Sequence, residues 1–342
     1  MTLLRPAYSL IAGSQQWTCQ LIELELALVP GPGIEELTVT LPATAPFAAK
    51  PGDPVSLELD GGEGSAAVFT GQITAVRRGL RTITVMAHGA LGQLARYHPA
   101  TTFENARAGT VIRSLADDAG LDTADIADGV SLPFYAADPS RNANEHASRL
   151  AAWSGAMLMP TAAGKVSAAI IDASQATVAL RYGRELIGFE ADTEAPGNAI
   201  TVVGESGAGD SSAPEALRLS TDVFAGNRPE GPSLGTAWNW EPALRTASAA
   251  ATAGAALRRG QAATQHTARL DAFLLPHLRP GVVVEIQDLP DGFAKGPYWI
   301  EQVRHRIDRR GATTSARLMQ GGDCFDPLAL LGSAVGALAG AF

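Results

Sequence analysis

The sequence predicts a mainly β fold with an α+β insert, in which two small β-barrel domains flank an α/β domain. An Ala-rich helix and an apolar C-terminal tail complete the prediction. Short runs of alternating apolar and polar residues fill the first hundred positions, helical periodicity replaces them between residues 110 and 155, and alternation returns near the end. The 342 residues, 46% of them hydrophobic, are enough for two or three domains. The 36 glycines and 21 prolines favour many short elements over a helical bundle.

Residues 1–98 are predicted to form the first β-barrel. Ile22, Leu24, Leu26 and Leu28 fall on one face of a strand, and the same period of two recurs at 37–41, 55–59 and 83–87. Gly- and Pro-rich turns separate these runs, as in small barrels and sandwiches. Gly71 interrupts one run and is expected to mark a bulge or a corner of the sheet.

Residues 99–190 are predicted to form an α/β domain. One helix covers residues 110–119, and Gly120 follows where a left-handed cap is favourable. A second helix begins at Asn142, whose side chain can cap it while Glu145 reaches back, and it ends at Gly155. A hairpin follows, with strands at 157–159 and 166–171.

Residues 191–325 are predicted to form the second β-barrel. A strand at 200–203 precedes a polar loop at 204–235, which is expected to be exposed or partly disordered. The Ala-rich helix is predicted over 240–263, with Pro242 in its first turn. Strands at 282–287, 298–307 and 313–320 close the unit. Trp238 and Trp240 have two interpretations: packing at the start of this helix, or a platform that binds sugars.

Charge and motifs argue against several classes of function. The net charge is −9, and no region is basic, which disfavours tight binding of a phosphate backbone. The two cysteines, Cys19 and Cys324, are expected to be buried free thiols. Neither the histidine spacing nor any Gly-rich or Ser-containing motif fits a metal, cofactor or catalytic site, so none of these is predicted. Arg304 and Arg306 belong to a basic cluster that is expected to form salt bridges with a subunit or neighbour, with DNA contact the less favoured alternative.

Three groups of segments resemble the late-control D family of phage tail hub proteins, which are similar to the N-terminal hub part of type VI secretion spike proteins. The resembling segments are residues 55–61, 69–76 and 82–89, then 111–121, 144–155 and 164–165, and finally 278–286, 296–307 and 313–319. Their order covers most of residues 15–325.

The resemblance implies a non-enzymatic baseplate or tail-tip hub. Three chains would form a ring in which two barrels per chain alternate, matching the sixfold tail tube on one side and the threefold central spike on the other. The implied partners are a tail tube or distal tail protein, a separate spike protein and the tape-measure protein. DNA would pass through the lumen without specific binding. Since no secretory signal is found, the protein is expected to be made in the host bacterial cytoplasm and to end in the virion.

The last segment, residues 326–342, is predicted to dock onto a partner. Residues 328–342 carry no charge, and Gly332, Gly336 and Gly340 recur at every fourth position, which permits close helix packing. As a helix this stretch would be about 22 Å long, short of a membrane core of about 30 Å, so stable membrane insertion is disfavoured. Docking at a trimer axis, into the spike or into the tape-measure end is expected. The residues predicted to contact a partner are Leu328, Leu331, Gly332, Gly336, Gly340 and Phe342, besides Arg304 and Arg306.

Two other functions remain as alternatives. A tail-associated cell-wall hydrolase would use this scaffold for attachment and would need an added catalytic domain. A carbohydrate-binding attachment module would use exposed aromatic side chains such as the Trp238 and Trp240 pair.

Overall fold

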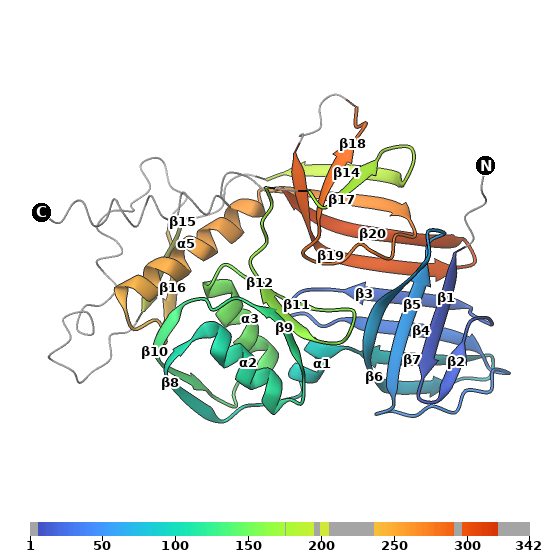
Figure 1. Ribbon diagram of the computed structural model, residues 1–342, viewed down its shortest axis with the longest axis horizontal. Helices are drawn as coiled ribbons and strands as arrows, with labels where there is room; N and C mark the ends of the chain where they lie inside the picture. Colours follow the sequence, from blue (N-terminus) through green and yellow to red (C-terminus); the bar gives the residue numbers. More distant parts are fainter. Residues whose placement is uncertain (1–5, 175, 195–198, 205–235, 291–295, 321–342) are drawn as a thin grey trace, which may run out of the picture.

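The protein is mainly β, as the sequence predicts, and four helices are found in the part of the chain that the computed structural model describes (Figure 1). The described residues are 6–174, 176–194, 199–204, 236–290 and 296–320. The predicted polar loop, apart from Gly204, and the C-terminal segment lie outside them.

The first β unit consists of seven antiparallel strands. They are β1 (Ala7–Ala12), β2 (Gln15–Trp17), β3 (Glu23–Leu28), β4 (Glu36–Pro42), β5 (Pro54–Asp60), β6 (Ser65–Arg78) and β7 (Thr82–His88). In space the order is β3-β4-β7-β6-β5-β1-β2. The strands alternate buried leucines and valines with polar residues, which explains the period of two in the sequence.

The second β unit consists of six strands. They are β13 (Val178–Arg181), β14 (Leu186–Thr193), β17 (His266–Phe273), β18 (Val283–Gln287), β19 (Pro297–Asp308) and β20 (Gly311–Gln320). The order is β14-β17-β20-β19, with β18 pairing one end of β19 and β13 running parallel to β18. The three closing strands are therefore confirmed, whereas β13 and most of β14 join this unit from within the range predicted to be α/β.

The two units share one strand order. In the first, β3 to β7 are arranged as β3-β4-β7-β6-β5, and in the second, β14, β17, β18, β19 and β20 are arranged as β14-β17-β20-β19-β18. If these five strands are numbered along the chain within each unit, leaving out β1, β2 and β13, both orders read first, second, fifth, fourth, third. The long fourth strands, β6 and β19, each carry a bulge against the fifth, at Thr74 and at Glu301.

The units form one continuous sheet instead of two separate barrels. β3 pairs with β19 in an antiparallel ladder, in which His305 lies opposite Leu26. The largest hydrophobic cluster extends through both units. Among the described strands the ladders do not close either unit into a barrel, so this part of the prediction differs from the structure.

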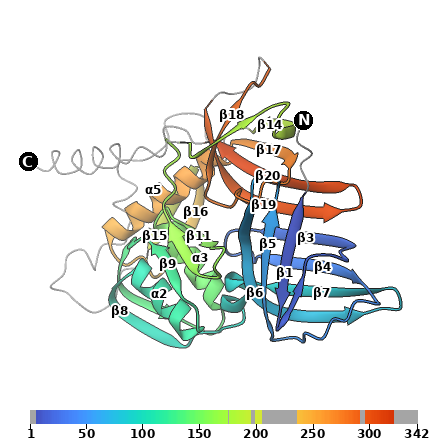
Figure 2. The same cartoon turned by 45° about the vertical axis from the view of Figure 1, so that its right-hand side comes forward.

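The α/β part follows the first unit in the chain and packs beside it (Figures 1 and 2). Its elements are α1 (Ala90–Leu94), β8 (Thr101–Arg107), α2 (Ala108–Asp118), β9 (Thr123–Ile126), β10 (Ser131–Ala137), α3 (Ala143–Trp153), β11 (Met157–Pro160) and β12 (Val166–Ala169). The predicted capping box of α3 is present, with Asn142 and Glu145 each bonding the other's backbone N–H. Gly120 has φ +73°, and β11 and β12 form the predicted hairpin.

Three further elements lie on the α/β part: β15 (Ala199–Gly204), β16 (Thr236–Glu241) and α5 (Ala247–Ala263). Val202 and Ala250 belong to the same core cluster as α2 and α3, although the sequence placed residues after 190 in the second barrel. The predicted start of α5 at residue 240 is wrong. Residues 236–241 instead pair with β15, and the Thr246 hydroxyl accepts from the Ala249 N–H, which sets the first turn beyond Pro242.

Candidate interaction surface at the junction of the two β units

The junction between the units is built from the alternation of β3 and β19. Leu24, Leu26 and Leu28 of β3 are buried in the common core, so Glu23 and Glu25 lie on the opposite, polar face. On β19, Val303 and His305 point into the core. Arg304 and Arg306 consequently share the polar face with the two glutamates.

Each arginine bridges the junction diagonally. In the ladder Arg304 lies opposite Ala27 and Arg306 opposite Glu25. Each guanidinium reaches the glutamate two residues before its opposite residue on β3: Arg304 lies 3.3 Å from Glu25, and Arg306 lies 2.8 Å from Glu23. Arg306 also contacts Asp308 at 3.1 Å. The ion pairs of Arg304 and Arg306 are therefore made within the chain. A contact of these arginines with another subunit or neighbour stays a prediction.

These ion pairs contribute little to the stability of the junction. The side chains of Arg304 and Arg306 are 60% and 48% exposed, and exposed pairs contribute about 0–1 kcal/mol each. A slip of one residue would place the leucines of β3 on the polar face, at a far greater cost. Leucine burial therefore holds the two units together, and the charges favour one alignment.

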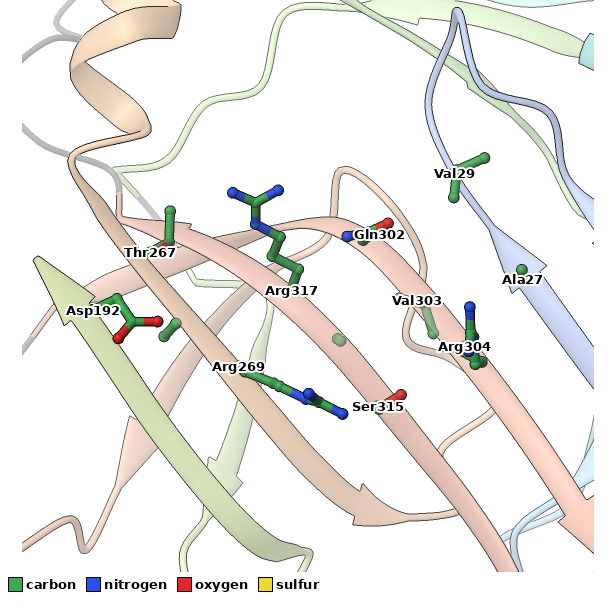
Figure 3. A pocket seen from close by; sticks show the side chains of 12 residues that line it. Ala27, Val29, Asp192, Thr267, Arg269, Gln302, Val303, Arg304, Ser315 and Arg317 are labelled. Carbon is green, nitrogen blue, oxygen red and sulfur yellow. The ribbon is translucent and has the colours of Figure 1, made fainter. Parts of the chain in front are cut away.

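A groove of about 410 Å³ opens on this polar face beside the junction (Figure 3). Its lining residues come from β3, β14, β17, β19 and β20, together with Val29, which follows β3. The charged ones are Arg269, Arg304 and Arg317, with Asp192 at the rim strand β14. Two of these three arginines already contact carboxylates of this chain, Arg304 with Glu25 and Arg317 with Glu301, so the charges of the groove are largely balanced from within.

Two of the arginines lie directly opposite each other on neighbouring strands. Arg269 of β17 pairs in register with Arg317 of β20, and like charges in that position repel. Figure 3 shows the two side chains diverging, with Arg269 extending toward Ser315. Arg317 lies 3.3 Å from Glu301, the bulge residue, whose pKa is raised by burial and held down in part by Arg317. No ion pair is found for Arg269 within the described ranges.

Two buried ionisable groups flank the junction. Glu35, the residue before β4, is 1% exposed, and both carboxylate oxygens accept from the Leu91 N–H at 3.2 Å. Burial raises the pKa of Glu35 to about 7, although these backbone hydrogen bonds and Arg279 oppose the shift. His305 is fully buried and its Nδ1 lies 2.9 Å from the Thr314 hydroxyl; burial lowers its pKa to about 4. The sequence did not single out Glu35, because a glutamate beside a turn is usually solvated.

Other predicted site residues have different outcomes. Leu328, Leu331, Gly332, Gly336, Gly340 and Phe342 lie outside the described residues, as does Cys324. Cys19 is exposed, which corrects the expectation of a buried thiol. The side chain of Trp240 is 56% exposed on β16, so it does not pack at the start of α5 as proposed.

Two negative findings concern the described residues alone. No group of three or more His, Cys, Asp or Glu side chains there is arranged to hold a metal ion. No helix within these ranges has the length and apolar character needed to cross a membrane.

Comparison with solved structures shows that the chain has the fold of phage tail proteins. A 43 kDa tail protein of prophage MuSo2 from Shewanella oneidensis superposes with a TM-score of 0.66 at 15% identity, over 92% of this chain and 98% of that one. A tail protein from Neisseria meningitidis MC58 gives 0.69 at 13% identity, over 93% and 97%.

A type VI secretion component of E. coli, described as structurally similar to the T4 bacteriophage tail proteins gp27 and gp5, gives a TM-score of 0.61 at 10% identity, over 92% of this chain and 78% of that one. No protein-family model matches the sequence, and no curated protein matches it. At these identities the similarity establishes the fold, and the resemblance in the sequence is confirmed at that level.

Proposed function

We propose that this chain is a structural hub protein of a phage tail or phage-like particle. Three copies form a ring that joins the sixfold tail tube to the threefold central spike, and its lumen passes DNA and the tape-measure protein. The observation that carries the proposal is the repeated strand order of the two β units, with β3 of the first paired to β19 of the second. Two equivalent units per chain give six units in a trimer.

Two strand edges, one along part of β6 and one along β14, support closure of such a ring. β20 pairs along one edge of β19, while β18 and β3 share its other edge, β3 at residues 303–307. β6 is the equivalent strand of the first unit. It pairs with β5 through residues 65–72 and with β7 through residues 72–78, and no described strand occupies its outer edge from Thr74 to Arg78. At the far end of the sheet, β17 is the one described strand that pairs with β14, apart from an isolated bridge between Leu186 and Tyr182.

In the proposed ring, β14 of one chain adds to β6 of the next as β3 adds to β19 within a chain. An unpaired strand edge is a template for a further strand, and the internal junction supplies the geometry. Repeating the step three times returns to the first chain. The ring can close because each unit joins the next through the same pair of equivalent strand edges and in the same direction.

Charge supports the same pairing. Within the chain, carboxylates of β3 meet arginines of β19. The two free edges carry charges in the same arrangement as β3 and β19. Glu190 and Asp192 are exposed on β14, the equivalent of β3, and Arg77 and Arg78 are exposed on β6, the equivalent of β19. Opposite charges at a contact favour the correct partner and speed encounter.

The polar face of the sheet carries mixed charge, which fits a lumen that DNA crosses without lasting contact. Arginines of β17, β19 and β20 alternate with carboxylates of β3 and β14 on this face. Interspersed charges lack the cluster of cations on which phosphate-backbone affinity depends. The proposed location is the tail tip or baseplate of the virion, and the proposed partners are the tail tube or distal tail protein, the spike and the tape-measure protein.

The mass of the full chain in solution tests the proposal. A species of three times 35.4 kDa is expected, measured by light scattering at several concentrations. A monomer that cleaves peptidoglycan would favour the hydrolase alternative, and a monomer that binds cell-wall glycans would favour an attachment module. Either result contradicts the hub proposal.

A further inference from the structure

An apolar groove of about 470 Å³ lies away from the β-unit junction, between the end of α3, the C-terminal half of α5 and the start of β19. Met157, Ile171, Leu257 and Trp299 contribute the larger apolar side chains of its wall. Its volume falls in the range of cavities that take up a small apolar ligand or a few side chains of a peptide. An open apolar groove of this kind favours an occupant that removes it from water.

Two hydrogen-bond donors belong to the wall of this groove and have no described partner. Trp299 is 8% exposed, and its indole Nε1 has no hydrogen-bond acceptor in the described part of the chain. The Nε of Arg259 is also buried without one. A buried donor without an acceptor costs about 1–3 kcal/mol. The backbone carbonyls of an apolar peptide are acceptors of the kind that both groups lack.

The chain itself leaves the sheet beside this groove. β20 ends at Gln320, and the preceding residue, Met319, lies opposite Trp299 in the β19–β20 ladder. Met319, Trp299 and Ile171 belong to one hydrophobic cluster, partly covered by Met157. The seven residues 321–327 can span up to about 25 Å, so a segment that follows them is within reach.

We propose that the apolar segment of the same chain, residues 328–342, binds in this groove. Part of the segment inserts its leucine, valine or alanine side chains between α5 and Trp299, and its carbonyls accept from the Trp299 indole and the Arg259 guanidinium. The segment is uncharged and apolar, which matches the wall. Attachment by a short linker raises its effective concentration at the groove to about the millimolar range, which favours it over an untethered partner.

Disulfide trapping tests the proposal directly. In a background with Cys19→Ser and Cys324→Ser, the pair Gly260→Cys and Ser333→Cys places one thiol in the groove wall and one in the segment. A β-carbon at Gly260 meets no atom within 4 Å, so the substitution is tolerated. The matched control replaces Gly260→Cys by Leu80→Cys, at the exposed tip of the β6–β7 hairpin.

Mild oxidation is expected to form the 260–333 bridge within one chain about tenfold faster than the 80–333 bridge. Equal rates, or bridges found only between chains, would overturn docking within the chain. Adding Trp299→Phe keeps an aromatic side chain but removes the indole N–H, and a several-fold lower rate is expected.

Deletion of residues 328–342 supplies a second measurement that does not depend on cysteines. Binding of the dye ANS is expected to rise several-fold because the groove is uncovered. An unchanged dye signal would count against the segment as the occupant. Neither test depends on the chain forming a ring, so failure here leaves the hub proposal standing.

Discussion

Arg306 on β19 donates a hydrogen bond of 2.8 Å to Glu23 on β3, although 283 residues separate the two along the chain. In the strand order that the two units share, β19 is the fourth strand of the second unit and β3 is the first strand of the first unit. Because the two units have the same strand order, this contact is the internal example of the contact proposed between chains.

The internal ion pairs are expected to contribute little to the free energy of unfolding. A double-mutant cycle with Glu23→Ala and Arg306→Ala should give a coupling energy of about 0.2–1 kcal/mol, because both side chains are nearly half exposed. Urea denaturation measures it. Replacing Arg306→Ala by Arg96→Ala, an exposed arginine after α1, should give additive effects. A coupling above about 2 kcal/mol would show that charge, and not leucine burial, holds the junction.

Charge reversal on the free edges should disrupt the proposed ring and then restore it. Arg77→Glu on β6 or Asp192→Arg on β14 alone should shift the mass distribution toward the monomer, because each places like charges together at the proposed contact. The double variant should recover the trimer at least in part. Mass photometry across a concentration series provides the measurement.

The control for this experiment is Arg96→Glu, which changes the net charge equally but lies away from both edges. It should leave the mass unchanged. If the double variant is no more trimeric than the single ones, β14 and β6 do not meet in the way proposed.

Replacing either of two glycines by alanine should change the free energy of unfolding, in opposite directions at the two positions. A β-carbon at Gly71 would collide with the backbone carbonyl of His88, where β6 passes from β5 to β7. Gly71→Ala should therefore lower the free energy of unfolding by about 1–3 kcal/mol. Gly260→Ala in α5 meets open space and should raise it by about 0.5–1 kcal/mol, through better helix propensity. Thermal unfolding of both variants distinguishes the effects, and a destabilised Gly260→Ala would contradict this account of α5.

The two buried ionisable groups at the junction, Glu35 and His305, should change the free energy of unfolding in opposite directions as the pH rises. Glu35 has a pKa raised from 4.5 to about 7, so its folded form holds a proton that the unfolded form has lost, and stability falls as the pH rises through this window. His305 has a pKa lowered from 6.5 to about 4, so its contribution is present above pH 6.5 and is lost as the pH falls through about 4.

Single substitutions should separate these two dependences. In Glu35→Gln, the free energy of unfolding should rise with pH between about 4 and 6.5, by up to about 1.4 kcal/mol per pH unit. In His305→Gln it should fall between about 4.5 and 7. Urea titrations at several pH values measure both slopes. If each variant keeps the slope of the unchanged protein, these two groups do not govern its pH dependence.

Much of the local structure could be predicted from residue patterns. The leucine alternation of β3, the capping box at Asn142 and the left-handed Gly120 are local features whose physical causes lie within a few residues. Salt bridges of Arg304 and Arg306 were expected with another subunit or neighbour, whereas the ion pairs that the structure has are within the chain. Glu23 and Glu25 meet these arginines only because β3 and β19 become neighbours in the sheet.

The predictions that differ from the structure concern features that depend on contacts between segments far apart in the chain. α5 begins at Ala247 because residues 236–241 pair with β15, and no local sequence signal indicates a parallel pairing between segments so far apart in the chain. Glu35 becomes a buried carboxylate because α1 presents the Leu91 N–H to it. The continuous sheet in place of two barrels likewise depends on one long-range ladder between β3 and β19.

Electron cryomicroscopy of the purified full-length assembly tests the central claim most directly. The account predicts a ring of three chains in which the two β units of each chain occupy alternating, nearly equivalent positions, with β14 of one chain beside β6 of the next. An assembly in which the two β units occupy unrelated environments, or in which β14 and β6 face solvent, would contradict it.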